Sequence, residues 1–186
     1  TGTYTLSGGT LSVTGPNGLA LGSAINGGNG IFNLNGPGTL NVSNFSVIGS
    51  ANIGSFNQTA GAASFSGALS IGSASTATGT YTLSGGTMGV AGSGIIGSSG
   101  TGRFTQTDGT ATFSNGLTVG SVSTAVGTVS LSNTGVLNVT AGGEVYGASN
   151  DGTLIQSGGT HFTVGSVTFG NNSTGAFGRG SFTSGT

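Results

Sequence analysis

Apolar and small polar residues alternate along most of this chain, in short runs that end at glycine-containing bends. In the first unit of the pattern, the apolar residues alternate within 4–6, 11–13 and 19–21. Alternation with a period of two residues is typical of β-strands, and the Gly-Gly, Asn-Gly and Asp-Gly pairs between the runs are typical of turns. Each unit therefore predicts three strands of about 4–6 residues. Because glycine interrupts every window and strong helix formers are scarce, we expect no helix.

The units repeat along the whole chain. The letters TGTYTLSGGT stand at 1–10 and return at 78–87. Each unit, or rung, opens with a glycine that is followed two residues later by a large apolar residue, and it closes with an apolar residue followed by glycine. The opening glycines are Gly2, Gly30, Gly54, Gly79, Gly102, Gly127, Gly152 and Gly180.

One rung cannot bury its apolar face alone, but similar rungs stacked in register can. Strands would then pair in parallel with their counterparts one rung away, at about 4.8 Å. The sequence therefore predicts an all-β fold, a single-stranded parallel β-helix (β-solenoid) of seven to eight rungs with three short strands each. We expect residues 1–186 to form one continuous repeat domain that is a segment of a longer array.

A finer alternation has a period of two rungs. Four residues after the opening glycine, the third, fifth and seventh rungs carry Gln58, Gln106 and Gln156, whereas the other rungs carry leucine up to the seventh. Ala-then-Phe pairs at 63/65 and 111/113 likewise alternate with Leu-then-Val or Met-then-Val pairs, and large residues beside small ones fill a narrow core without voids. We expect the glutamines to lie inward or at a corner with their amides paired, because an unpaired buried amide costs about 1–3 kcal/mol.

The composition narrows the class of protein. Glycine supplies 42 of 186 residues, whereas Lys+Arg number 2 and Asp+Glu number 3. So little charge argues against binding to nucleic acid or to an anionic membrane surface. The chain has no cysteine, which excludes disulfides and thiolate metal sites. Every apolar run is broken within a few residues, so we expect a chain that does not span a membrane.

The motifs Gly-Thr-Tyr-Thr-Leu-Ser-Gly-Gly-Thr-Leu at 2–11 and Leu-Ala-Leu-Gly-Ser at 19–23 carry a family resemblance. With them the chain resembles autotransporter-associated β-strand repeats, and it is similar to the Gly-rich repeat regions of large secreted bacterial surface proteins. The resemblance covers essentially the whole chain. It implies a right-handed parallel β-helix that is exported and displayed outside the cell, in adhesion or biofilm roles. It brings no catalytic residues.

The three acidic residues are all interpreted structurally. Asp108 and Asp151 stand in turn sequences, and aspartate tolerates such bends. Glu144 falls where other rungs place an inward leucine. A one-residue bulge at 142–143 would turn Glu144 to solvent and place Val145 inside. We therefore predict an exposed Glu144.

The remaining ionisable residues give no recognisable site. His161 is the only histidine, so we place it on a surface or in a strand, and Arg103 and Arg179 are isolated. Glycoside hydrolysis needs two carboxyl groups about 5–9.5 Å apart, and the pattern places Asp108 and Glu144 one rung apart in different parts of the rung. We predict no catalytic, cofactor-binding or metal-binding residue and no enzymatic activity.

These observations favour a structural extracellular scaffold, which would be a surface stalk, an adhesin passenger or a self-assembling matrix filament subunit. Open strand edges are templates for association, so the expected partners are copies of the chain, stacked end to end or laterally, together with surface glycans or host and matrix molecules. The alternative is a carbohydrate-active or carbohydrate-binding β-helix. A minor alternative is an ice-binding threonine array. Its outward pairs would be Thr3/Thr5, Thr80/Thr82 and Thr110/Thr112. The column is interrupted by Ile31, Arg103 and Ile155.

Overall fold

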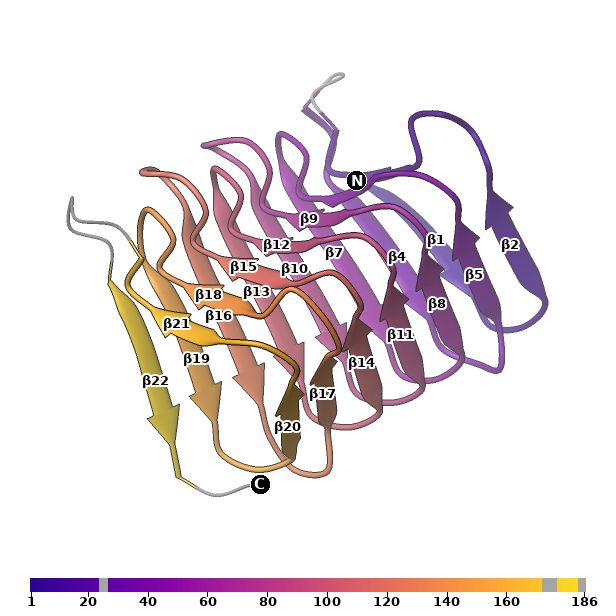
Figure 1. Cartoon of the computed structure of the whole chain (residues 1–186). Coiled ribbons are helices and arrows are strands. Elements are labelled where there is room, and N and C mark those ends of the chain that lie inside the picture. The colour runs from indigo at the N-terminus through magenta and orange to yellow at the C-terminus, as the bar shows by residue number, and fades with distance from the viewer. Residues whose placement is uncertain (24–26, 172–176, 184–186) are drawn as a thin grey trace.

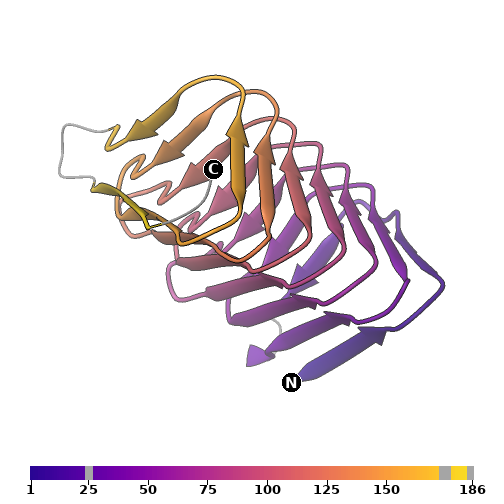
Figure 2. The same ribbon diagram turned by 90° about the horizontal axis from the view of Figure 1, so that it is seen from below.

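The computed structural model describes residues 1–23, 27–171 and 177–183. In this part of the chain, 22 strands wind into a stack of three-sided rungs, and no α-helix is present (Figure 1). Viewed from below, the rungs lie one behind another, with the two ends of the chain at opposite ends of the stack (Figure 2). The predicted all-β solenoid is confirmed.

The strands form three sheets that run along the stack, and each rung adds one strand to each sheet. The first sheet holds β1 (Gly2–Leu6), β4 (Gly30–Leu34), β7 (Ile53–Gln58), β10 (Thr78–Leu83), β13 (Thr101–Gln106), β16 (Val126–Leu131), β19 (Gly152–Gln156) and β22 (Gly178–Phe182). The second holds β2 (Thr10–Val13), β5 (Thr39–Val42), β8 (Ala62–Phe65), β11 (Thr87–Val90), β14 (Thr110–Phe113), β17 (Val136–Val139) and β20 (Thr160–Thr163). The third holds β3 (Leu19–Leu21), β6 (Ser46–Ile48), β9 (Leu69–Ile71), β12 (Gly94–Ile96), β15 (Leu117–Val119), β18 (Glu144–Tyr146) and β21 (Val167–Phe169).

All strand pairs are parallel and join equivalent positions of successive rungs. Gly2 pairs with Gly30, Gly30 with Gly54, and Gly54 with Gly79. The pairing continues in this way through Gly102 and Gly127 to Gly152. The repeat detected in the sequence is therefore the register of the first sheet, and the two copies of TGTYTLSGGT are the first and fourth rungs.

The eighth rung corrects one predicted start. Gly152 pairs with Gly178, and Gly180 pairs with Leu154 instead. The reason is backbone crowding, because a Cβ at Gly178 would meet the backbone of Tyr146 and Gly170, whereas a Cβ at Gly180 would meet only side chains. The opening position is thus the one where the strand crosses closest to the closing glycine of the rung before.

Inward side chains of the three sheets share one apolar core. Its most regular part is a column of five aromatic rings in the first sheet, with successive centroids 5.2, 4.8, 4.6 and 5.7 Å apart. The column consists of Tyr4, Phe32, Phe56, Tyr81 and Phe104. The predicted alternation of volume is also present, since Ala63 lies between Leu40 and Met88 in the second sheet.

The glutamines lie inside the core, as predicted, and their amide nitrogens are paired with the backbone. Gln58 Nε2 donates to the carbonyls of Gly61 (3.1 Å) and Thr87 (2.9 Å), and Gln106 Nε2 donates to two equivalent carbonyls. Gln58 Oε1 accepts from the Tyr81 hydroxyl at 2.5 Å.

The prediction of complete pairing is wrong for Gln106, whose Oε1 is buried without a hydrogen-bond partner. The difference lies in the next rung. The residue that follows Phe104 in the aromatic column is Val129, which has no hydroxyl, whereas the rung after Gln58 supplies Tyr81. The tyrosine of the following rung thus satisfies the amide oxygen of Gln58, and the valine of the following rung leaves that of Gln106 unpaired.

Candidate functional site

The polar centre of the described chain surrounds Glu144, at the start of β18 in the sixth rung. Its exposed fraction is 1%, so the predicted exposure of Glu144 is wrong. Gly142 and Gly143 both have positive φ, but they do not shift the strand, because Glu144 pairs in register with Leu117 below and Val167 above. The side chain therefore takes the inward direction of Leu117, and Val145 faces outward and is half-buried.

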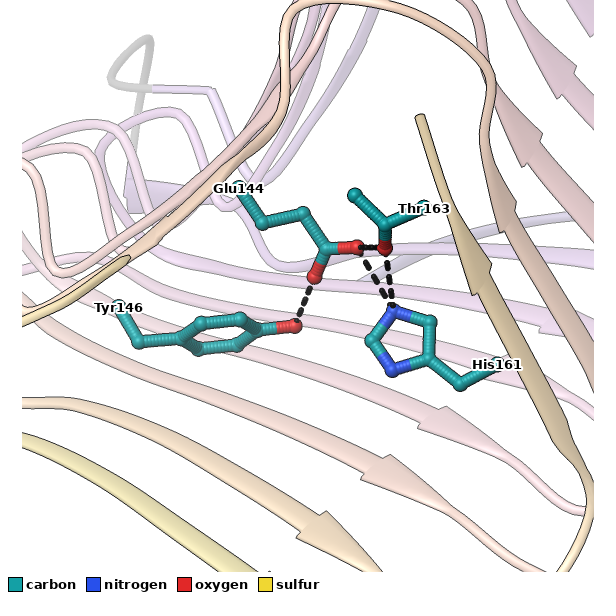
Figure 3. A network of polar contacts seen from close by, with 4 residues as sticks. All are labelled: Glu144, Tyr146, His161 and Thr163. Atoms are coloured by element: carbon teal, nitrogen blue, oxygen red, sulfur yellow. Dashed lines mark hydrogen bonds and ion pairs between the residues drawn. The ribbon is translucent and has the colours of Figure 1, made fainter. Parts of the chain in front are cut away.

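Three side chains donate hydrogen bonds to this carboxylate (Figure 3). The Tyr146 hydroxyl, from the same strand, donates to Oε2 at 2.6 Å. His161 Nε2 lies 2.7 Å from Oε1, and the Thr163 hydroxyl also donates to Oε1. The carboxylate thus has a donor on each oxygen, which is the condition under which a buried charge is tolerated.

The two partners from the seventh rung occupy core positions of the second sheet. His161 pairs with Leu137, and Thr163 pairs with Val139, both of which are fully buried apolar residues one rung below. Only at this rung does the described second sheet turn two polar side chains inward. The inward glutamate of one rung is therefore matched by an inward histidine and threonine of the next.

Burial and hydrogen bonding act in opposite directions on Glu144. Desolvation, the largest effect, raises the pKa of this carboxyl, but the hydrogen bond and the charge of His161 and the hydroxyls of Thr163 and Tyr146 together lower the pKa below its ordinary value. The carboxylate is thus the favoured form in neutral solution. Burial first, and then the adjacent carboxylate, raises the pKa of Tyr146 well above the usual range, so this hydroxyl remains a donor.

The arrangement differs from a hydrolase triad. In a triad, the acid and the nucleophilic hydroxyl bind opposite nitrogens of the histidine ring. Here His161 Nε2 faces both Glu144 Oε1 and, at 3.4 Å, Thr163 Oγ1 (Figure 3). The geometry is that of an ion pair reinforced by hydroxyl groups. Among the described residues, no group of three or more His, Cys, Asp or Glu could hold a metal ion.

The other Asp and Arg side chains lie outside the core. Asp108 is exposed in the bend after β13, and its Oδ1 accepts from the Gly109 amide (2.7 Å) and the Thr134 hydroxyl (2.8 Å). These two bonds lower its pKa. The predicted turn role of Asp108 is confirmed, and Asp151 lies in the connection that precedes β19.

Arg103 and Arg179 occupy the same outward column of the first sheet, in β13 and β22. Arg179 lies 5.9 Å from the centroid of the Phe177 ring. Thr80 and Thr128 flank Arg103 on the neighbouring strands, so an arginine interrupts the column of threonines, as the sequence indicated.

The threonine pairs do not form one array. The pairs 3/5 and 80/82 belong to the first sheet, whereas the pair 110/112 belongs to the second. The hydroxyl groups that the sequence pattern grouped together therefore lie on two different faces of the stack.

The cluster around Glu144 was missed because each residue was judged alone. One signal was available: the seventh rung places His and Thr at the alternating positions where lower rungs place Leu137 and Val139. Two polar residues on an inward face require a polar partner, and Glu144 was the only inward-register acidic residue.

The geometry defines the class of the protein, a three-sided parallel β-solenoid built from sequence repeats. Comparisons with family models, with curated proteins and with solved structures found no match. The resemblance to autotransporter-associated repeats therefore stays a prediction. No helix formed by the described residues is long and apolar enough to cross a membrane.

Proposed function

We propose that this chain is a structural, non-enzymatic scaffold outside the cell, either a surface stalk or adhesin passenger or a subunit of a self-assembling matrix filament. The observation that carries the proposal is the uninterrupted core. Strands pair in register from β1 to β22 along the first sheet, and the closing turns bond from rung to rung through their backbone amides. A stack of this kind can hold the parts at its two ends a fixed distance apart and can present an extended surface, and neither role needs a pocket.

The positions of the carboxyl groups and the composition of the chain agree with this proposal. A carbohydrate-active β-helix would need two carboxyl groups that face the same substrate. Here the Glu144 carboxylate is enclosed by its own core, and Asp108 is bonded within a turn. The chain is rich in Ser, Thr, Asn and Gly, and a polar but nearly uncharged composition of this kind suits a secreted protein.

Copies of the chain are the proposed partners. Every described rung presents the same parallel register to the next one, so a rung of another copy could pair in the same way. A free strand edge carries unpaired N–H and C=O groups and can template another strand. A head-to-tail contact that does not close produces a filament.

Electron microscopy of the purified chain tests the proposal. We expect rods or filaments whose width is that of one rung and whose length grows with protein concentration. Particles that stay single at every concentration would contradict the filament subunit and would favour the surface stalk or adhesin passenger. Depolymerisation of a polysaccharide by the purified chain would contradict the structural role altogether.

A further inference from the structure

We propose that the contact between Glu144 and His161 is a pH-sensitive clasp that fastens the seventh rung to the sixth. The two residues come from different rungs, and His161 Nε2 lies 2.7 Å from Glu144 Oε1 inside the stack. Side-chain exposure is 0% for Glu144 and 9% for His161, so water screens the pair little. This inference goes beyond the scaffold proposal and does not depend on it.

The clasp stands where the aromatic column has ended. The rings of the first sheet are followed by Val129 in the sixth rung and Leu154 in the seventh, and Gly180 occupies the position in the eighth. Across the junction of the sixth and seventh rungs, the one stacked ring pair is Tyr146 with Phe169, at 5.1 Å. This junction therefore holds one stacked ring pair, as the first three junctions of the aromatic column do, and the contact between Glu144 and His161 adds a polar connection to it.

Other ionisable groups do not face the pair. Within the described chain, the elements packed around it are β15, β16, β17, β19, β21 and β22, and their inward side chains carry no charge. These side chains are Leu117, Val119, Val129, Leu131, Leu137, Val139, Leu154, Gln156, Val167, Phe169 and Phe182. Tyr146 is the remaining titratable neighbour, and it stays protonated until strongly alkaline pH. No charged group other than this pair therefore faces the junction in the described chain.

The direction of the pH effect follows from the carboxylate. The pKa of Glu144 is lowered in the folded chain, so the contact stabilises the junction above the ordinary glutamate value and is lost as the pH falls through the folded value. An imidazole is cationic in acid. Protonation of Glu144 would then remove the negative charge that faces the imidazole, and the contact would lose its electrostatic component. Acid should loosen the seventh rung before the rest.

Hydrogen exchange of the 186-residue chain, followed by mass spectrometry and corrected for the intrinsic rate, tests the clasp. The measured quantity is the protection of β20 and β21 relative to β10 and β11. Between about pH 7 and about pH 3, a range that spans the ordinary histidine and glutamate values, we expect this ratio to fall at least about tenfold. A ratio that does not change with pH would overturn the proposal.

The chain itself supplies a matched control. The variant Glu144→Leu, Tyr146→Phe, His161→Leu, Thr163→Val adopts the apolar residues that the register places one rung below for three of the four positions. Replacing a buried ion pair with well-packed apolar residues is often neutral or stabilising. In this variant the ratio should stay flat across the pH range. A fall as large as in the natural chain would overturn the proposal.

A second measurement needs no variant. Since His161 is the only histidine, its ring signals can be assigned in an NMR spectrum without ambiguity. We expect these signals to respond to ionisation of Glu144 and to reach the values of a free imidazole when β20 loses protection. Ring signals that show no inflection where Glu144 ionises would contradict the clasp.

Discussion

The same ten letters fold in two places, at 1–10 and 78–87, and their side chains have different environments. Tyr4 is 47% exposed and stacks on one ring, Phe32. Tyr81 is 0% exposed, lies between two rings and donates its hydroxyl to a buried amide. Since the local sequence is identical, the neighbouring rungs alone account for the difference. In this fold the role of a residue is set about two dozen positions away.

Removing the two tyrosine rings should give the largest difference in the free energy of unfolding between the two copies of the repeat. Tyr81→Ala empties a site enclosed by Phe56 and Phe104 and should cost about 3–5 kcal/mol, as for other buried aromatic residues. Tyr4→Ala loses one stacked contact, worth about 0.5–1.5 kcal/mol. Urea unfolding followed by circular dichroism measures both. Equal losses would show that the two copies share one environment after all.

A glycine pair gives the next largest contrast. Gly9 and Gly86 occupy the same place in the repeat, with φ of 74° and 82°. An added Cβ at Gly86 would collide with the backbone oxygen of Gly61, whereas at Gly9 nothing lies within 4 Å. Gly9→Ala should cost only the left-handed strain, about 1–2 kcal/mol, and Gly86→Ala should add about 1–3 kcal/mol of overpacking.

Thermal unfolding of the two glycine variants is the measurement. If Gly86→Ala lowers the midpoint no more than Gly9→Ala, then the rungs approach each other less closely at this turn than their register requires.

The smallest contrast isolates one hydroxyl group. Tyr81→Phe leaves Gln58 Oε1 buried without its donor and should cost about 1–3 kcal/mol. Tyr4→Phe removes a hydroxyl from an exposed side chain and should change stability by less than about 0.5 kcal/mol. Chemical unfolding of the two variants side by side gives the answer. A neutral Tyr81→Phe would mean that Gln58 tolerates an unpaired oxygen, as Gln106 does.

The fold could be predicted because its signals are periodic. From Gly30 onward, each opening glycine is required by a close backbone crossing. Each alternating run is required by an inward face, so the register follows from spacing alone. The start of the last rung was predicted wrongly because Gly180 fits the motif Gly-x-Phe, although Gly178 is the residue at the backbone crossing. The spacing between closing and opening glycines indicated the right start. From Gly170 to Gly178 it is eight residues, the same as from Gly22 to Gly30.

The polar cluster could not be predicted in the same way, because it depends on pairing between sheets. Strand register places Glu144 above Leu117 and His161 above Leu137, but the contact between them crosses from the third sheet to the second. A repeat pattern gives the register within one sheet, but it does not say which side chains of two different sheets meet. The unpaired oxygen of Gln106 has a different origin within the first sheet, since it depends on which side chain the following rung presents.

The hydrogen bonds between rungs are directed along the stack, and this has a mechanical consequence. Tension applied between the two ends would load the outermost turn first, because each turn is held only by its neighbours. Releasing one turn would exchange about 5 Å of stacked height for about 80 Å of extended chain. Such a molecule would lengthen in discrete steps under load.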